Sequence, residues 1–232
     1  MRAAILAGGQ GTRLRPYTTI LPKPLVPLGD RPILEHIIAQ LARAGVNHVD
    51  LCVSHLGGLI QTYFSQAGHL PPGVELRWHW EDTPLGTAGA LQVIPDLDET
   101  FIAMNGDVLT DIDYRELVDF HHDSRAALTI ATRRTPVQVD LGVIEHTGQW
   151  VTDYREKPTL SYDASMGIYV YEPIALQYLP PGICQFPELV LRLIQAGERV
   201  AAFLTDAAWY DIGTPDEYER AAADTRLYSD MA

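Results

Sequence analysis

The sequence predicts an α/β fold built on a doubly wound, mostly parallel sheet with a partly antiparallel extension. Up to about residue 133, short apolar runs alternate with amphipathic helical patterns, which is typical of a parallel sheet covered by helices. Beyond that point, several strand-like runs follow one another without long helices between them. With 232 residues, of which 47% are hydrophobic and 20% charged, the chain can bury one large core.

The expected elements begin with a buried strand at residues 3–7, which ends at glycines and is followed by a polar loop to about Gly29. Asp30 and Pro32 then predict the start of a helix, whose apolar residues recur at helical spacing until Gly45. The same patterns predict further strands at residues 48–53, 74–80, 101–104, 127–132, 141–145, 150–155 and 165–171, and helices at residues 59–66, 86–93, 114–123, 186–196 and 215–226.

Composition and charge exclude several classes of function. The formal net charge is −13, so a nucleic-acid-binding surface is not expected, because phosphate contacts need clustered positive charge. Cys52 and Cys184 lack metal-binding spacing, so neither a disulfide framework nor a zinc site is expected, and Cys52 should lie in the core. His121 and His122 are expected at the solvated end of a helix, not at a metal site.

No segment predicts contact with a membrane. No apolar stretch approaches the roughly 18 residues that span a bilayer, and the N-terminal residues meet glycines before a signal peptide's apolar region could form. The cytoplasm is therefore the expected compartment.

A glycine-rich loop follows the first strand. Gly8, Gly9 and Gly11 allow backbone N–H groups to approach a phosphate closely, because no Cβ intervenes. The loop has Leu14 where a dinucleotide-binding fingerprint needs its third glycine, and it lacks the Gly-Lys-Ser/Thr of a Walker A loop. We interpret it as a phosphate loop of another kind that carries Arg13, although a plain turn with a surface arginine is the alternative.

The use of lysine is unusual. Only two of the 17 basic residues are lysines, Lys23 and Lys157, and each is followed directly by proline. A lysine ammonium is a compact charge with three donors and suits a phosphate ligand. The alternative for Lys157 is a solvated surface pair with Glu156.

The segment from Leu6 to Leu28 (LAGGQGTRLRP, continuing to PKPLVPL) resembles the signature of the sugar-1-phosphate nucleotidyltransferases, or nucleotide-sugar pyrophosphorylases. Further segments match in the family's order to about Tyr218. The resemblance implies a Rossmann-like fold of the nucleotide-diphospho-sugar transferase type. It implies a single domain over residues 1–232, with a nucleotide-binding half to about 133 and a sugar-phosphate-binding half at about 134–232. The C-terminal β-helix of some mannose-type members is not expected.

The resemblance implies an enzyme of the EC 2.7.7 class, which transfers a nucleotidyl group from a nucleoside triphosphate to a sugar 1-phosphate and releases pyrophosphate. Because two anions must meet, cationic side chains and carboxylate-held Mg²⁺ are expected, without a nucleophilic serine or cysteine. The sequence of residues 85–90, Leu-Gly-Thr-Ala-Gly-Ala, resembles the corresponding segment of guanylyltransferases that act on mannose or manno-heptose 1-phosphate. A dTTP- or UTP-dependent glucose-1-phosphate enzyme is the alternative.

Carried over residue by residue, the resemblance implies three sets of site residues. The catalytic set is Arg13, Lys23, Asp107, Lys157 and Asp211, of which Asp107 and Asp211 would hold Mg²⁺. The nucleotide would contact Leu6, Ala7, Gly8, Gly9, Gly11, Thr12, Arg13, Lys23, Gly86, Thr87, Asn105 and Asp107. The sugar phosphate would contact Gly142, Glu156, Lys157, Ser165 and Gly167.

Two features of this set bear on its interpretation. Asp107 ends a buried strand, at the edge where open α/β sheets bind ligands. The triplet Ser165-Met166-Gly167 departs from the asparagine-containing triplet of many members, which leaves the identity of the sugar open.

Two other classes of protein agree less well with these residues. A non-catalytic paralogue would be expected to lack at least one of Arg13, Lys23, Asp107 and Asp211, and all four are present. A dinucleotide-dependent oxidoreductase is disfavoured by Leu14 and by the missing acid after the second strand. The expected partners are the two small-molecule substrates, with no nucleic acid and no membrane; the sequence leaves the oligomeric state open.

Overall fold

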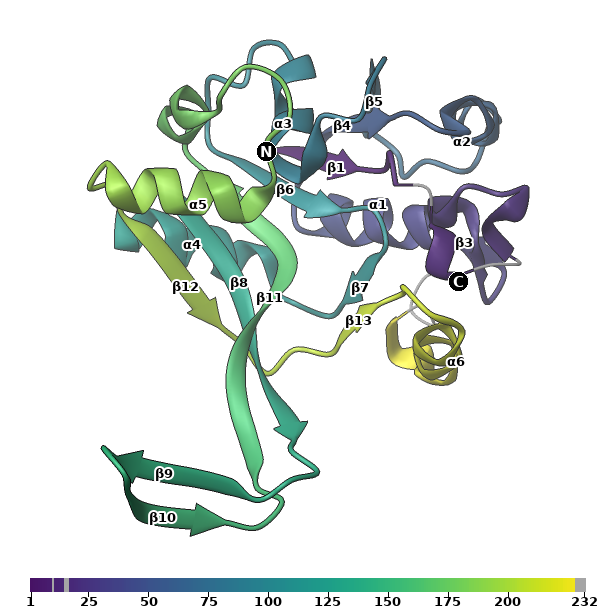
Figure 1. The fold of residues 1–232 in the computed structure, drawn as a ribbon. Helices are drawn as coiled ribbons and strands as arrows, with labels where there is room; N and C mark the ends of the chain where they lie inside the picture. The colour runs from purple at the N-terminus through teal and green to yellow at the C-terminus, as the bar shows by residue number, and fades with distance from the viewer. Residues whose placement is uncertain (10, 15–16, 228–232) are drawn as a thin grey trace.

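A computed structural model describes residues 1–9, 11–14 and 17–227 of the chain (Figure 1). The strands of its central sheet are β1 (Arg2–Leu6), β4 (His48–Val53), β5 (Glu75–Trp80), β6 (Phe101–Asn105), β8 (Leu128–Gln138), β11 (Thr159–Tyr171) and β12 (Val200–Leu204). They lie in the order β12-β8-β11-β6-β1-β4-β5. All neighbours are parallel except β11, which runs antiparallel to both β6 and β8. The predicted α/β fold, mostly parallel with an antiparallel part, is confirmed.

Short strand pairs and six α-helices complete the described fold. The pairs are β2 (Pro27–Leu28) with β3 (Arg31–Pro32), β7 (Val108–Thr110) with β13 (Trp209–Asp211), and β9 (Val143–Thr147) with β10 (Trp150–Arg155). The helices are α1 (Ile33–Arg43), α2 (Gly57–Phe64), α3 (Gly86–Gly89), α4 (Tyr114–Ser124), α5 (Phe186–Gln195) and α6 (Pro215–Ala223). Within the described residues, no helix is both long and apolar enough to cross a bilayer.

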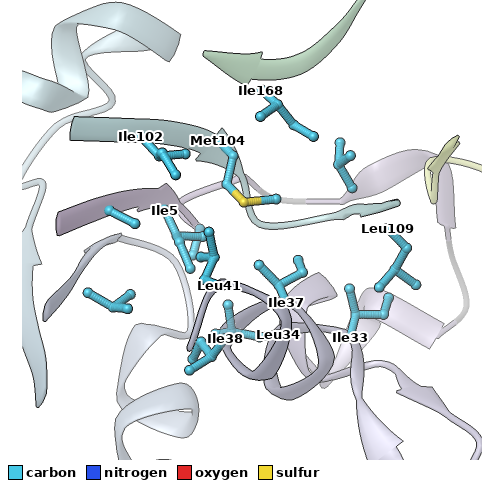
Figure 2. Close-up of a cluster of buried hydrophobic side chains, with 14 of the residues drawn as sticks. Ile5, Ile33, Leu34, Ile37, Ile38, Leu41, Ile102, Met104, Leu109 and Ile168 are labelled. Atoms are coloured by element: carbon cyan, nitrogen blue, oxygen red, sulfur yellow. The ribbon is translucent and has the colours of Figure 1, made fainter. Parts of the chain in front are cut away.

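The side chains of the central strands alternate between two apolar layers, as the period of a strand requires. One layer faces α1 (Figure 2) and includes Ile5, Ile33, Leu34, Ile37, Ile38, Leu41, Ile102, Met104 and Ile168. The other faces α3 and α5 and includes Ala4, Cys52, Ala88, Phe101, Ala103, Leu189 and Leu193. The expected burial of Cys52 is confirmed. The two layers fix β1 and β6, whose carboxyl ends carry the site described below.

Helix starts agree with the sequence only in part. Thr214 caps α6, because its hydroxyl accepts from the Glu217 amide at 3.3 Å. Asp30, by contrast, does not cap α1: that helix begins after Pro32 and has no side-chain cap. Residues 31–32 instead pair with β2 in a small hairpin, so the chain is already held in place by strand pairing where the helix starts.

The largest departure from the expected elements is the length of β8 and β11. The apolar runs predicted strands at 127–132 and 165–171, but the structure continues them to Gln138 and back to Thr159. These added parts pair with one another, from Ser165 with Thr132 to Thr159 with Gln138. Both faces of these added parts are exposed and carry polar as well as apolar residues. The alternation of apolar and polar residues that predicts a half-buried strand is therefore absent from the sequence there.

The expectation of a solvated His121 was wrong. The residue is fully buried, with Nδ1 2.8 Å from the Thr129 hydroxyl and Nε2 3.2 Å from a Glu172 carboxylate oxygen. Burial lowers the pKa of His121 below its usual 6.5.

This lowered pKa makes stability depend on pH. The unfolded chain binds a proton at His121 more readily than the folded chain, so the stabilisation is present above about pH 6.5 and is lost as the pH falls further. We expect the melting temperature of the protein to fall between about pH 7 and about pH 5, and to fall less in His121→Gln. His55→Gln, at an exposed position far from these partners in the sequence, is the control and should behave like wild type. Equal pH dependence in all three proteins would contradict this account.

Candidate active site

A pocket of about 280 Å³ opens at the carboxyl ends of β1 and β6. Ligands of open α/β sheets bind at this edge, because the loops that follow the strands diverge there. The lining residues are Leu6, Ala7, Gly8, Gly9, Lys23, Pro24, Ser54, Glu81, Pro84, Gly86, Thr87, Ala90, Asn105, Gly106, Asp107 and Gln185. Segments that are distant in sequence therefore meet in one concavity.

The glycine loop forms one wall of this pocket. A Cβ at Gly8 would lie 2.9 Å from a Glu81 carboxylate oxygen and 3.0 Å from the Ser54 hydroxyl, so any larger residue there would displace these two side chains. A Cβ at Gly9 would meet nothing within 4 Å, so its backbone is open to a ligand. Gly11 has a φ of +60° and packs against Lys23. The loop can therefore offer backbone to a phosphate and also support the lysine.

Lys23 lies between Pro22 and Pro24 and begins a short 3₁₀ turn, Lys23–Leu25. The fixed φ of proline favours this turn, and the Val26 amide donates to the Lys23 carbonyl at 3.0 Å. Lys23 is only 7% exposed. The turn thus holds a buried ammonium at the pocket, where burial without a partner would be costly.

The partners of Lys23 are two carboxylates that a strand pair brings together. β7 and β13 pair antiparallel with Val108 opposite Asp211, and the Ile212 amide donates to the Asp107 carbonyl at 3.1 Å. Lys23 Nζ contacts Asp107 Oδ2 and lies 3.9 Å from Asp211 Oδ1. Residues far apart in sequence therefore form one compact cluster of charges.

The two carboxylates do not experience the same surroundings. Burial raises the pKa of Asp211, and the nearby Asp107 carboxylate raises it further, while Lys23 and Arg13 oppose the shift. Arg13 is exposed, and its guanidinium lies close to the backbone of Gly213. A Cβ added at Gly213 would be 3.3 Å from it. The two carboxylates therefore repel each other, and each cation placed near them stabilises their charged forms.

This cluster suits a small divalent cation. Asp107 Oδ1 is buried and has no hydrogen-bond partner, and carboxylate oxygens are the ligands that Mg²⁺ prefers. Among the described residues, no group of three or more His, Cys, Asp or Glu side chains could hold a metal ion. A sparse pair of carboxylates leaves positions for phosphate oxygens and water, as is usual for Mg²⁺.

The opposite wall of the pocket is the loop that begins α3. Gly86 has a φ of +82°, and a Cβ there would lie 2.6 Å from the Cys184 carbonyl oxygen. The Thr87 hydroxyl accepts from the Phe186 amide at 2.8 Å and donates to Gln185 Oε1 at 3.3 Å. Gly86 and Thr87 are thus fixed against the start of α5, with Gln185 beside them in the pocket.

Three polar pocket residues were not predicted from the sequence: Ser54, Glu81 and Gln185. The Ser54 hydroxyl donates to the Gly8 carbonyl at 2.7 Å, and the Leu85 amide donates to Glu81 Oε2 at 2.9 Å. Ser54 follows β4 directly and Glu81 follows β5, so their positions after strands were an available signal. Gln185 comes from the far end of the chain and offered none.

The predicted nucleotide contacts fall largely in this pocket. Leu6, Ala7, Gly8, Gly9, Lys23, Gly86, Thr87, Asn105 and Asp107 line it. Gly11 and Arg13 lie beside it, against Lys23 and Gly213. The side chain of Thr12 lies outside the part of the chain that the structure describes. The roles proposed for these residues stay predictions.

The predicted sugar-phosphate contacts are divided between two places. Gly167 is at the pocket edge, where a Cβ would lie 2.7 Å from Asn105 Nδ2, and the Ser165 hydroxyl accepts from its amide at 3.4 Å. Gly142, Glu156 and Lys157 are exposed at the outer end of the β8–β11 ribbon and line no part of this pocket. Within one chain, the structure does not bring them to Lys23 and Asp107.

Gly142, Glu156 and Lys157 nevertheless lie near one another. The Tyr154 ring packs on Gly142 so closely that a Cβ would meet it, and the Tyr154 hydroxyl donates to Glu156 Oε2 at 2.8 Å. Lys157 has a φ of +42°, and its carbonyl accepts from Gln138 Nε2 at 2.7 Å. The three positions thus form a second cluster, separate from the pocket.

Comparison with known proteins places the chain in a family. The model of the nucleotidyl transferase family matches residues 2–227, so the chain belongs to this family. It is 33% identical over 244 residues to UTP–glucose-1-phosphate uridylyltransferase of Synechocystis sp., covering 95% of this chain and 62% of that protein. It is 30% identical over 232 residues to mannose-1-phosphate guanylyltransferase of Mycobacterium tuberculosis, covering 96% of this chain and 64% of that protein. The chain therefore spans less than two thirds of the length of these relatives.

Solved structures share the fold. HddC from Yersinia pseudotuberculosis superposes with a TM-score of 0.74 at 27% identity, covering 96% of this chain and 98% of that chain. The same protein has been solved in complex with GMP-PN, with a TM-score of 0.72 at 26% identity. The recognition of a nucleotidyltransferase family from the sequence is confirmed, as is the fold of its sugar-phosphate members.

Proposed function

We propose that the protein transfers a nucleotidyl group from a nucleoside triphosphate to a sugar 1-phosphate and releases pyrophosphate. One observation carries the proposal: a pocket walled by an open glycine backbone ends at a buried lysine that contacts Asp107 and lies near Asp211. Backbone N–H groups and an ammonium suit the phosphates, and paired carboxylates suit the metal that accompanies a triphosphate. The family and its relatives support the same reaction.

The reaction needs positioning and charge more than covalent help. An oxygen of the sugar 1-phosphate attacks the α-phosphorus in line, and the bond from that phosphorus to the bridging oxygen of pyrophosphate breaks. The attacking oxygen is already ionised, so no side chain has to remove a proton. Lys23 and Arg13 hold the triphosphate and stabilise the negative charge that develops on the leaving pyrophosphate.

Asp107 and Asp211 would hold Mg²⁺, which when bound neutralises phosphate charge. Because Lys23 contacts Asp107, its ammonium would turn from this carboxylate toward the triphosphate, which would leave Asp107 available to hold the metal. Its flexible stem allows this, whereas a planar guanidinium would be harder to accommodate at a site only 7% exposed.

GTP is the triphosphate that we propose, and Glu81 is the observation that favours it. Its carboxylate lies on the pocket wall beside Gly8, and Oε2 already accepts from the Leu85 amide. Guanine presents two adjacent N–H donors on its base-pairing edge, whereas uracil and thymine present one N–H between two carbonyl oxygens. A carboxylate therefore complements guanine and repels the carbonyls of the other two bases. The complex of HddC with GMP-PN supports the same preference.

Mannose or manno-heptose 1-phosphate is the proposed acceptor, with a UTP- or dTTP-dependent glucose-1-phosphate enzyme as the second candidate. The test is pyrophosphate release, measured in the presence of Mg²⁺ over a grid of GTP, UTP and dTTP against mannose, manno-heptose and glucose 1-phosphates. Turnover only with UTP or dTTP and glucose 1-phosphate would refute the GTP assignment. Absence of turnover in every combination would refute the reaction.

Asp107→Asn should remove activity while preserving the fold. The amide is a poor metal ligand, and the developing charge on the phosphates loses its support, so kcat should fall by at least about 100-fold. Lys23 keeps Asp211 at 3.9 Å, so the melting temperature should change little. Asp119→Asn, an exposed position on α4, is the control and should leave both quantities unchanged. A fully active Asp107→Asn protein would refute the metal assignment.

Glu81→Gln should weaken the preference for guanine. The glutamine keeps the size of the side chain and can still accept from the Leu85 amide, but it loses the charge that strengthens the bonds to N–H donors. Such a bond contributes about 1.5–3 kcal/mol, so the ratio of kcat/KM for GTP to that for UTP should fall roughly 10- to 100-fold. The measurement is kcat/KM for both nucleotides in wild type and variant. An unchanged ratio would mean that residues other than Glu81 set the preference for guanine.

A further inference from the structure

Gln185 is a polar residue of the pocket to which the proposed reaction assigns no role. It lines the pocket beside Gly86 and Thr87. It is exposed, so a ligand that enters the pocket can reach its side chain. Although Gln185 is the N-cap residue of α5, its side chain makes no hydrogen bond that caps this helix. The side chain is therefore directed to the pocket instead of to its own helix.

The backbone at Gln185 is held on both sides. Its carbonyl accepts from two amides in the first turn of α5, at 3.0 and 3.3 Å. The preceding residue, Cys184, is joined to α3, because its carbonyl accepts from two amides of that helix at 3.1 and 2.9 Å. The Cys184 amide also donates to the Leu85 carbonyl at 2.8 Å. A side chain that starts from such a rigid backbone meets a ligand in a defined place.

Thr87 determines which atom of the Gln185 amide faces the pocket. Gln185 Oε1 accepts from the Thr87 amide at 3.4 Å and from the Thr87 hydroxyl at 3.3 Å. A backbone N–H can only donate, so the atom beside it is the oxygen and not the nitrogen. Nε2 lies beside Gly86, where an added Cβ would be 2.9 Å from it. The two N–H donors of Nε2 are therefore left for an acceptor in the pocket.

Gln185 belongs to a wall of the pocket that leads to the predicted sugar contacts. Phe186, the next residue, stacks its ring on Tyr169 with 3.9 Å between the ring centroids. Tyr169 is on β11 and interacts with the side chain of Ser165. Gly167, between these two residues, is at the pocket edge. A continuous row of contacts thus joins Gln185 to the segment that is expected to meet the sugar phosphate.

We infer that Gln185 is a specificity-determining residue, whose side-chain amide donates a hydrogen bond to a hydroxyl oxygen of the sugar 1-phosphate. The inference rests on the proposed function, in which Glu81 meets the base and Lys23 the phosphates. A neutral amide suits a hydroxyl, whereas the charged phosphates are met by the ammonium.

A fixed donor of this kind would select among sugars. Aldose 1-phosphates share the phosphate and differ in the number and positions of their hydroxyls. A sugar without a hydroxyl opposite Gln185 would leave the amide unpaired in a pocket from which it displaces water. Such an unmade hydrogen bond is a stronger basis for discrimination than a small difference in apolar contact.

The first test uses the nucleotide and sugar pair that gives turnover in the grid of substrates. Gln185→Leu has a side chain of similar size without donors, so KM for the sugar 1-phosphate should rise about tenfold, while KM for the nucleoside triphosphate stays unchanged. Gln195→Leu is the control, because it is the same change at an exposed position of α5 outside this pocket. An unchanged KM for the sugar 1-phosphate in Gln185→Leu, or a rise confined to the triphosphate, would overturn the inference.

The second test identifies the hydroxyl. Wild type and Gln185→Leu are compared on the sugar 1-phosphate and on its deoxy analogues, each of which lacks one hydroxyl. Loss of the hydroxyl that Gln185 meets should raise KM about tenfold in wild type and leave KM unchanged in the variant, where the bond is already absent. If every deoxy analogue raises KM by the same factor in both proteins, Gln185 contacts no hydroxyl of the sugar.

The third test does not depend on turnover. Calorimetry with GDP-mannose and UDP-glucose measures the affinity for a nucleotide sugar, and calorimetry with GTP and UTP measures the affinity for the nucleotide alone. Gln185→Leu should bind the nucleotide sugar about tenfold more weakly than wild type and the triphosphate equally well. This result from a protein without nucleotidyl transfer would refute the proposed function and keep the sugar contact. Transfer by wild type, with equal affinity of both proteins for the nucleotide sugar, would do the reverse.

Discussion

The arrangement of the site depends on the ammonium of Lys23, which is held against Asp107 and near Asp211. Two carboxylates brought this close by the pairing of β7 with β13 repel each other, and burial of Asp211 adds to the cost of its charge. A cation must lie nearby for the pair to persist in the folded chain. The turn that begins at Lys23, between two prolines, supplies this cation, and Gly11 packs against the lysine stem.

The same constraint bears on how an acidic protein would bind the phosphates of the proposed reaction. The net charge of the chain describes its surface as a whole, whereas affinity for a phosphate depends on the few groups that face it. Here the cations are placed singly: Lys23 in the pocket, Arg13 beside Gly213 and Lys157 at the outer end of the β8–β11 ribbon. In the proposed reaction, this separation would let each cation meet a different phosphate group.

Much of the fold and of the pocket was predictable because their signals are local. The apolar runs of β1, β4 and β6 and the periodicity of α1 follow from burial on both faces of a sheet. The glycines of the loop and Asp107 at the end of β6 follow from the same strand positions. By contrast, β7 and β13 are only three residues long, too short to show the alternation that predicts a strand. The burial of His121 was not predictable either, because its contacts come from Thr129 and Glu172 on other elements.

By itself, the sequence determined the order of the elements, the glycine loop and the chemical types of the groups proposed to bind phosphate and metal, because each shows as a pattern of neighbours within a few residues. Only the tertiary structure decided which groups meet. It joined Asp211 to Asp107, brought Glu81 and Gln185 into the pocket, and placed Lys157 at the outer end of the β8–β11 ribbon, away from Lys23. Such contacts are set by strand pairing and by the length of a ribbon, and both depend on residues that are far apart in the chain.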